Sequence, residues 1–147
     1  MATQLEIVTA EQVVYSGEVE AVVLPGVSGE LGILPHHAPF LTFLKPGELR
    51  IVVKGDEEEF IAVTGGFLEV LENHVRVLAD TAERLEEIDL ERAEAAMVRA
   101  KERISADPSN LDMERSLASI RRADLRVQLV KRRRTAQRSR LPGAQNA

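Results

Sequence analysis

The stretch IDLERAEAAMVRAKERI, residues 88–104, marks the place where the hydrophobic period of this chain changes. Within it, apolar side chains recur at intervals of three and four residues, which places them on one stripe of an α-helix. The members of this stripe are Leu90, Ala93, Met97, Ala100 and Ile104. Asp89 directly precedes the stripe and suits the N-cap, because a short carboxylate accepts hydrogen bonds from the free amides of the first turn. The stretch therefore predicts a helix that begins close to Leu90.

The residues before this helix indicate short β-strands. Segments rich in Val, Ile, Leu and Phe, several of them alternating apolar with polar positions, are separated by Gly, Asn and Asp, which suit turns. The expected strands are 5–9, 13–17, 18–25, 40–44, 48–53, 58–63, 67–71 and 74–80. Their regular spacing predicts an antiparallel β-sandwich or barrel.

The residues after the first helix predict a second one. The sequence SADPSN (105–110) interrupts the helical period, and a new pattern runs from about residue 111 to residue 134, with Met113, Leu117, Ile120 and Val127 on one side. Two antiparallel helices joined by a short loop form a helical hairpin. The segment 135–147 has neither an apolar period nor a cap and is expected to be disordered. We therefore expect a sandwich over 1–83, a hairpin over 84–134 and a basic tail over 135–147.

Charge divides the chain at the same place. Residues 1–83 carry fourteen acidic side chains against four basic ones, whereas residues 84–147 carry ten against fifteen. Arginine supplies most of the positive charge after residue 83, with thirteen arginines and two lysines. This asymmetry argues against one large core shared by both halves.

The residue types of the chain favour a protein without catalytic chemistry. The absence of cysteine excludes disulfides and thiolate metal sites. His36 and His37 are candidates for a metal site, but neighbouring side chains on an extended segment point to opposite sides, and no spaced carboxylate pair completes a ligand set. Serine and threonine occur without a matching His and Asp arrangement. We therefore expect no catalytic residue, no metal and no required cofactor.

Three motifs follow one another along the chain: GELGILPHHAPFLTFLKPGELRI (29–51), TGGFLEVLENHVRVLADTAE (64–83) and IDLERAEAA (88–96). In combination, order and spacing they are similar to the signatures of the ATP synthase epsilon subunit of bacterial type. The resemblance covers residues 3 to about 134. It implies an N-terminal β-sandwich and a C-terminal two-helix hairpin, the same architecture that the periodicity predicts.

The resemblance also implies a function. Members of this family are non-catalytic rotor subunits in the central stalk of the proton-translocating ATP synthase. Their sandwich couples the gamma subunit to the c-ring, and their mobile hairpin can inhibit ATP hydrolysis by reaching the alpha and beta subunits of the catalytic head. We therefore expect a peripheral location on the cytoplasmic face of the bacterial inner membrane, with membrane contact only through the complex.

For the sandwich, the resemblance places one loop toward the c-ring and the gamma subunit. We expect Glu30, His36 and His37 to lie in this loop, because loops carry binding residues more often than strands do. The alternative is that the glycines and prolines of residues 29–39 only shape a structural turn.

For the hairpin, the resemblance implies a site for regulatory ATP. Members that bind ATP share the motif I/L-D-x-x-R-A, and further contacts map onto both helices. The matching residues are Glu83, Ile88, Asp89, Arg92, Ala93, Arg99, Arg122 and Arg126. Guanidinium groups suit bidentate contact with phosphate. The alternative is a solvated arginine face with ion pairs between neighbouring turns.

The basic side of the second helix is the expected inhibitory contact with the catalytic head. Its members are Arg122, Arg126, Lys131, Arg132, Arg133 and Arg134. A different class of function stays open beside the resemblance, namely a sandwich adaptor whose basic C-terminus binds nucleic acid or an anionic membrane. Aromatic residues make up only 3% of the chain and the predicted sandwich is acidic, which argues against binding to nucleic acid.

Overall fold

In the computed structural model, the described residues are 1–106 and 113–140. They divide into two compact units, of which the first is Met1–Glu87 and the second begins at Ile88. The predicted boundary after Glu83 falls inside the last strand of the first unit. Part of the predicted interhelical loop and the end of the predicted tail lie outside the described residues.

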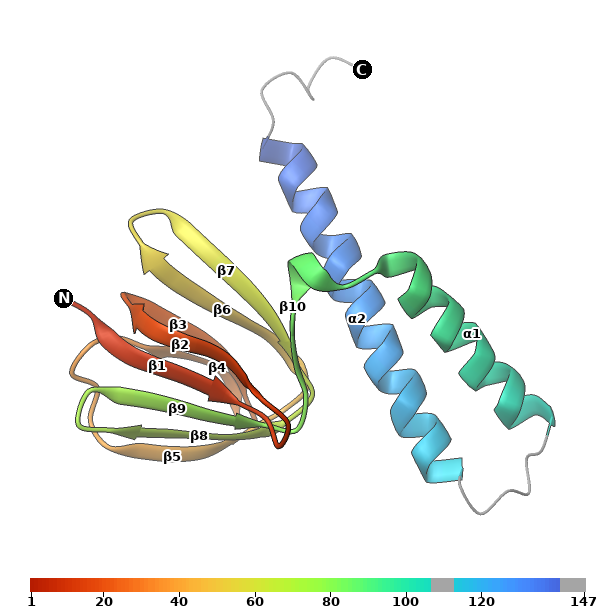
Figure 1. Ribbon diagram of the computed structural model, residues 1–147, viewed down its shortest axis with the longest axis horizontal. Helices are drawn as coiled ribbons and strands as arrows, with labels where there is room; N and C mark the ends of the chain where they lie inside the picture. Colours follow the sequence, from red (N-terminus) through yellow and green to blue (C-terminus); the bar gives the residue numbers. More distant parts are fainter. Residues whose placement is uncertain (107–112, 141–147) are drawn as a thin grey trace. The chain divides into compact units, whose positions relative to one another are not determined.

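The first unit is the predicted β-sandwich, built as one curled sheet (Figure 1). Its strands are β1 Thr3–Val8, β2 Val13–Val19, β3 Ala21–Gly26, β4 Gly29–Ile33, β5 Phe40–Leu44, β6 Gly47–Lys54, β7 Glu57–Val63, β8 Gly66–Leu71, β9 His74–Ala79 and β10 Ala82–Arg84. They hydrogen-bond in the order β10-β7-β6-β3-β5-β8-β9-β1-β2, and β4 pairs with β3. All pairs are antiparallel except β1 with β9. The sheet curls so far that β2 contacts β6.

The inward side chains of this sheet form one core. Successive residues of a strand point to opposite faces, so alternate apolar residues fill the interior. The largest fully buried side chains are Leu5, Ile7, Leu24, Ile33, Leu49, Ile51, Ile61 and Leu68. All of them belong to the first unit, which therefore has a hydrophobic core of its own.

Two strands of the sheet are not among the predicted ones. Strand β4 has the sequence GELGI, whose two glycines weaken β propensity and favour a turn assignment. Strand β10 has only three residues and pairs with β7. Strand β4 forms a hairpin with β3, which directly precedes it, whereas β10 pairs with a strand about twenty residues earlier in the sequence.

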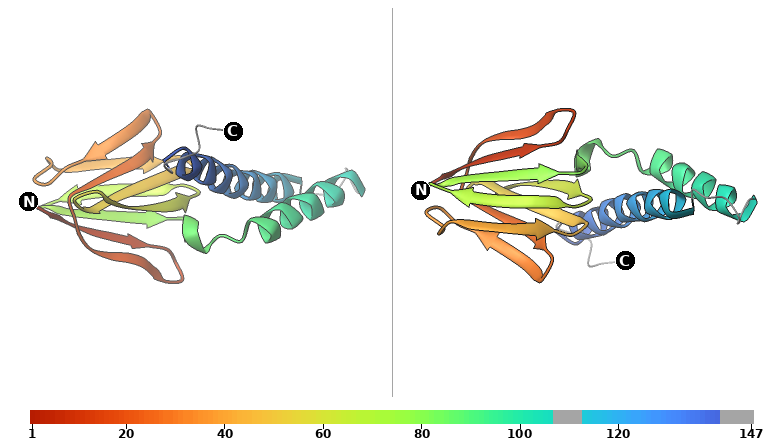
Figure 2. Two further views of the ribbon diagram at one scale, coloured as in Figure 1. Left: turned by 90° about the horizontal axis from the view of Figure 1, so that it is seen from above. Right: turned by 90° about the horizontal axis from the view of Figure 1, so that it is seen from below.

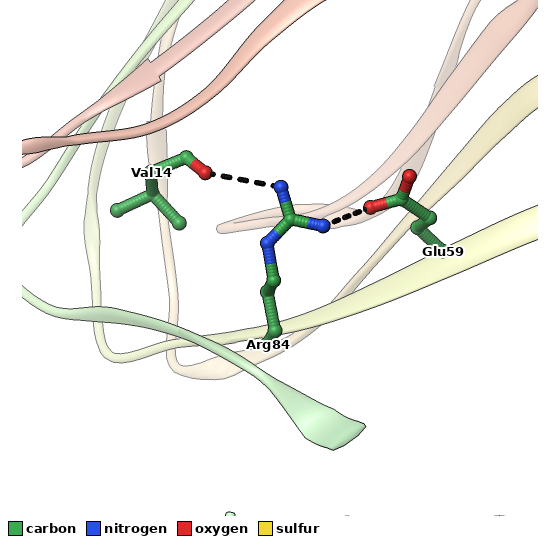
Figure 3. A network of polar contacts seen from close by, with 3 residues as sticks. All are labelled: Val14, Glu59 and Arg84. Carbon is green, nitrogen blue, oxygen red and sulfur yellow. Dashed lines mark hydrogen bonds and ion pairs between the residues drawn. The ribbon is translucent and has the colours of Figure 1, made fainter. Parts of the chain in front are cut away.

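Arg84 of β10 joins the two ends of the strand order (Figure 3). Its Nη1 lies 2.5 Å from Glu59 Oε2 on β7, and its Nη2 donates to the carbonyl oxygen of Val14 on β2 at 3.4 Å. The guanidinium also lies 5.8 Å from the centre of the Tyr15 ring. The side chain thus occupies a backbone acceptor of the edge strand β2, which would otherwise be open for pairing.

The second unit contains the predicted helical hairpin. A 3₁₀ turn, Leu85–Glu87, precedes it, and its helices are α1 Leu90–Ala106 and α2 Met113–Arg140. The predicted N-cap is confirmed, because the Arg92 amide donates to Asp89 Oδ1 at 3.1 Å. The two helices lie side by side in Figures 1 and 2. Lys131 Nζ and Glu94 Oε1 form an ion pair at 2.9 Å between the C-terminal half of α2 and the N-terminal part of α1.

Two details of α2 differ from expectation. Val127 is buried, as expected, but Leu117 is 39% exposed, and the buried side of the helix also contains Ala123, Leu129 and Val130. The helix also continues past the expected end at Arg134 to Arg140. The residues 135–140, TAQRSR, include good helix formers and no glycine or proline, so they extend a helix that is already nucleated.

Candidate functional site

A row of outward-facing apolar side chains crosses half of the sandwich. The register pairs Phe43 with Phe67, Phe67 with Leu78, Leu78 with Val8, and Val8 with Val13, so these residues follow one another across β5, β8, β9, β1 and β2. Cross-strand partners lie on the same face of a sheet. The inward neighbours of these residues belong to the core, which places the row on the outer face. We call Val8, Val13, Phe43, Phe67 and Leu78 the apolar row.

The apolar row is accessible within the described chain. Phe43 is 69% exposed and Val13 is 59% exposed, while Val8 and Leu78 are half-buried. The Phe43 and Phe67 rings meet edge to face, with centroids 6.4 Å apart. Leu41, next to the row on β5, is also 69% exposed. Contiguous exposed apolar surface of this kind marks interaction sites.

The next row across β5, β8, β9 and β1 consists of charged residues except at Leu41. Leu41 pairs with Glu69, Glu69 with Arg76, and Arg76 with Glu6. The Arg76 Nε lies 3.7 Å from Glu6 Oε2. The outer face thus combines an apolar strip with a flanking charged strip, the composition of a protein interface with a polar rim. The sequence alone does not predict this surface, because the pattern becomes visible only when the register aligns strands that are far apart in sequence.

The predicted His36 and His37 lie together in the segment 34–39 between β4 and β5, which we call the histidine loop. His36 is exposed and has a φ of 62°, in the left-handed region. His37 Nδ1 lies 2.7 Å from the Ala38 carbonyl oxygen, so this nitrogen carries the proton and donates. The His37 ring also packs beside Phe40, with centroids 5.8 Å apart. The histidine loop therefore has a defined conformation with His36 facing solvent.

Glu30 does not lie in the histidine loop, contrary to expectation. It is an exposed residue of β4, paired with Pro25 near the start of that strand, whereas the histidine loop follows the end of β4. The positive φ of 131° at Gly29 completes the turn from β3, so Glu30 enters the sheet at once. The structure brings His36 and His37 together and leaves Glu30 at the other end of the strand.

The hairpin places its predicted ATP-binding arginines at successive levels. Because Lys131 lies opposite Glu94, two antiparallel helices of equal rise bring Arg99 level with Arg126. Arg92 then lies about seven residues, or ~10 Å, further along the hairpin, and Arg122 lies ~6 Å away in the other direction. Arg92, Arg99 and Arg122 are exposed, and Arg126 is half-buried.

The remaining predicted ATP-binding residues have structural roles of their own. Asp89 caps α1, and Ile88 and Ala93 are buried. Glu83 is half-buried on β10, opposite Ala62, and so belongs to the first unit rather than to the hairpin.

The predicted inhibitory residues lie on α2. Arg122, Lys131, Arg132 and Arg134 are exposed, while Arg126 and Arg133 are half-buried. Lys131 is engaged by Glu94, so contact with another acidic partner requires exchange of this ion pair. Both side chains are about half exposed, and such pairs contribute less than ~1 kcal/mol.

Two further properties bear on the class of protein. Over residues 1–106 and 113–140, no group of three or more His, Asp or Glu side chains is arranged to hold a metal ion. Neither α1 nor α2, as described, has the length and apolar character needed to cross a membrane.

Comparisons with known protein families match both units. The family described as the ATP synthase Delta/Epsilon chain, beta-sandwich domain, matches residues 2–85. The family described as the ATP synthase Delta/Epsilon chain, long alpha-helix domain, matches residues 86–131.

Individual relatives are described as epsilon chains of ATP synthases. The ATP synthase epsilon chain of Herpetosiphon aurantiacus is 50% identical over 137 residues, which cover 93% of this chain and 100% of the relative. The ATP synthase epsilon chain of Carboxydothermus hydrogenoformans is 57% identical over 102 residues, which cover 69% of this chain and 75% of the relative.

Solved structures with the same fold come from ATP synthases. A chain in the Euglena gracilis mitochondrial ATP synthase, solved as OSCP/F1/c-ring, aligns with a TM-score of 0.62 and 23% identity, covering 90% of this chain and 79% of that chain. A chain in the central stalk/c-ring of the Tetrahymena thermophila mitochondrial ATP synthase aligns with a TM-score of 0.54 and 17% identity, covering 88% and 94%. At these identities the likeness concerns the fold.

Proposed function

This chain belongs to the ATP synthase delta/epsilon family, as an epsilon chain, and from that premise we propose that it is a non-catalytic rotor subunit of the central stalk. The sandwich binds the gamma subunit and the c-ring, and the hairpin restrains ATP hydrolysis. The chain requires no cofactor and takes ATP as a regulatory ligand. It lies on the cytoplasmic face of the bacterial inner membrane and meets the membrane only through the complex.

The observation that carries the rotor assignment is the apolar row. A rotor subunit has to stay attached while the stalk turns, which favours a broad contact with the gamma subunit over a few surface ion pairs. Phe43 and Phe67 supply aromatic area for such a contact, and the charged row beside them supplies a polar rim. The histidine loop, whose polar side chains are His36 and His37, is the complementary contact for the c-ring.

The gamma contact is tested with one substitution on the apolar row. Phe43→Glu places a charge where the contact excludes water, so the affinity of the full chain for purified gamma subunit should fall at least ~10-fold, equivalent to about 1.4 kcal/mol. Val98→Glu is the matched control, because Val98 is also an exposed apolar residue but lies on α1. Calorimetry or surface plasmon resonance gives both affinities. Equal affinities for the two variants would remove the apolar row as the gamma contact.

The restraint on hydrolysis comes from the basic side of α2. In the hairpin conformation Lys131 pairs with Glu94, and in an extended conformation it becomes available to acidic segments of the alpha and beta subunits. The exposed Lys131–Glu94 pair contributes little, so exchanging it adds little to the free-energy difference between the two conformations. When the two conformations differ little in free energy, a small additional free energy is enough to change their relative populations.

Regulatory ATP supplies this additional free energy by binding the hairpin conformation. Arg99 and Arg126 share one level of the hairpin, and Arg122 and Arg92 lie on either side of it along the axis. Phosphate groups beside these guanidinium groups would offset their mutual repulsion. A tenfold preference of ATP for the hairpin conformation shifts the equilibrium by about 1.4 kcal/mol.

The nucleotide site is tested by ATP titration of the isolated chain. Arg92→Ala should weaken ATP binding at least ~10-fold, because a charged hydrogen bond to phosphate contributes about 1.5–3 kcal/mol. Arg115→Ala is the control, since Arg115 is an exposed arginine in the first turns of α2, away from the level of Arg99 and Arg126. AMP should bind much less tightly than ATP. If the two variants bind ATP equally well, the arginines form only a solvated face.

A further inference from the structure

Asn73 joins three segments of the sandwich at the end where the N-terminus lies (Figure 1). It occupies the two-residue turn between β8 and β9, where Leu71 pairs with His74. Glu72 and Asn73 have φ angles of 49° and 60°, the geometry of a hairpin turn with two left-handed residues. Asparagine tolerates this conformation better than most residues do, so its presence in the turn has a local explanation.

The Asn73 side chain makes contacts that the turn itself does not require. Its Oδ1 accepts a hydrogen bond from the His36 amide at 2.9 Å, and its Nδ2 donates to the Ala2 carbonyl oxygen at 2.9 Å. Its backbone carbonyl accepts from Thr3 Oγ1 at 2.7 Å and from the Gln4 amide at 3.1 Å. One residue therefore connects the histidine loop, the N-terminal strand and the β8–β9 turn.

The contact with His36 falls on the most constrained residue of the histidine loop. His36 has a φ of 62°, and this left-handed conformation costs free energy for a residue other than glycine. Such a conformation persists where contacts with the surrounding structure stabilise it. The His36 amide is exposed to water and could exchange its partner freely without Asn73. The adjacent His37 ring is held separately by the Ala38 carbonyl and Phe40. Asn73 is thus the long-range contact that fixes the backbone at His36.

From this geometry we infer that Asn73 is a positioning residue for the histidine loop, which it holds in the conformation that meets the polar loops of the c-ring. The part of this inference that concerns binding to the c-ring rests on the proposed rotor function. The contact between Asn73 and the histidine loop stands independently of that function and can be measured in the isolated chain.

Three variants of the full chain separate positioning from folding. Asn73→Gly keeps the left-handed backbone but removes both side-chain hydrogen bonds. Asn73→Asp keeps an oxygen acceptor for the His36 amide and loses the donor to Ala2. Glu72→Gly is the matched control, because it changes the other left-handed residue of the same turn, which is exposed while Asn73 is half-buried.

The first readout is amide hydrogen exchange at His36, measured by NMR in the isolated chain. Asn73→Gly should accelerate exchange about 5- to 10-fold, the equivalent of one hydrogen bond, while Asn73→Asp and Glu72→Gly should keep the rate of the parent chain. Unchanged exchange at His36 in Asn73→Gly would overturn the inference. A general loss of protection across β8 and β9 in that variant would also overturn it, because the residue would then serve folding alone.

The second readout is binding to a detergent-solubilised c-ring that carries the gamma subunit. Asn73→Gly should weaken binding about 5- to 10-fold, and Asn73→Asp should restore it. Accelerated exchange with unchanged binding would overturn the role of Asn73 in the contact while leaving the rotor function intact. If the parent chain itself does not bind the rotor, the proposed function fails, and the exchange comparison alone then decides whether Asn73 positions the loop.

Discussion

The pKa of Tyr15 depends on the contacts that close the sandwich. This residue is the only tyrosine of the chain, it is buried, and its ring lies beside the Arg84 guanidinium that connects β10 to β2. Burial raises the pKa of Tyr15 above its ordinary value of 10.0, the negative charge of Glu59 raises it further, and Arg84 partly offsets both. The neutral phenol is therefore the form that the folded state favours.

Because of this pKa shift, the free energy of unfolding should decrease at alkaline pH. Because the folded pKa of Tyr15 exceeds the unfolded one, its stabilising contribution is fully present below about pH 10 and is lost as the pH rises through the folded pKa. Tyr15→Phe should lack this loss, so its free energy of unfolding should fall less between pH 9 and pH 11 than that of the parent chain. The ultraviolet absorbance of tyrosinate gives the pKa directly, since the chain has no tryptophan. A Tyr15 pKa at or below 10 would contradict the buried environment.

At this scale, local contacts were predictable and distant ones were not. The Asp89 cap follows from a bond between residues three positions apart, and the sequence predicts it correctly. The contacts of Arg84 with Glu59 and Val14 span 25 and 70 residues. Nothing in the neighbourhood of Arg84 along the chain indicates that it connects opposite ends of a sheet.

Among the elements, α2 carries the proposed inhibitory surface, and its basic end allows a direct test. Replacing Arg132, Arg133 and Arg134 by alanine removes three charges and preserves helix propensity. ATP hydrolysis by the assembled complex should rise, and inhibition by the parent chain should weaken with salt, because charges at a surface are screened over about 8 Å at physiological ionic strength. The replacement of Arg115 alone serves as the control. Inhibition that is insensitive both to the triple substitution and to salt would assign the contact to the apolar side of α2.

Elements that are defined by their local sequence were predicted, whereas an element that depends on pairing with another strand was not. Strands β5 and β9 and helix α1 were predicted close to their actual bounds, because apolar period and turn residues define them locally. Strand β4 was not predicted, since its glycines resemble a turn and pairing with β3 supplies its structure. The same limit applies to the site: the histidine loop was found from its sequence, whereas the apolar row depends on a register among five strands.

For the whole molecule, the family membership and the two-unit architecture are consistent with the proposal that the sandwich binds the rotor and the hairpin restrains hydrolysis. Membership of this family argues against an unrelated adaptor. Because residues 1–87 have a hydrophobic core of their own, we expect the sandwich to fold without the hairpin. The motifs predicted this architecture because they span both units. They did not predict where Glu30 lies relative to the histidines, because that depends on the start of β4.

The most direct test compares ATP hydrolysis by the assembled complex containing either the full chain or the fragment Met1–Glu87. The fragment retains the apolar row and the histidine loop, so it should remain bound to the gamma subunit at full occupancy. We predict that the complex with the fragment hydrolyses ATP faster than the complex with the full chain, since the fragment lacks α2. Equal rates at equal occupancy would contradict the proposal that the hairpin restrains hydrolysis.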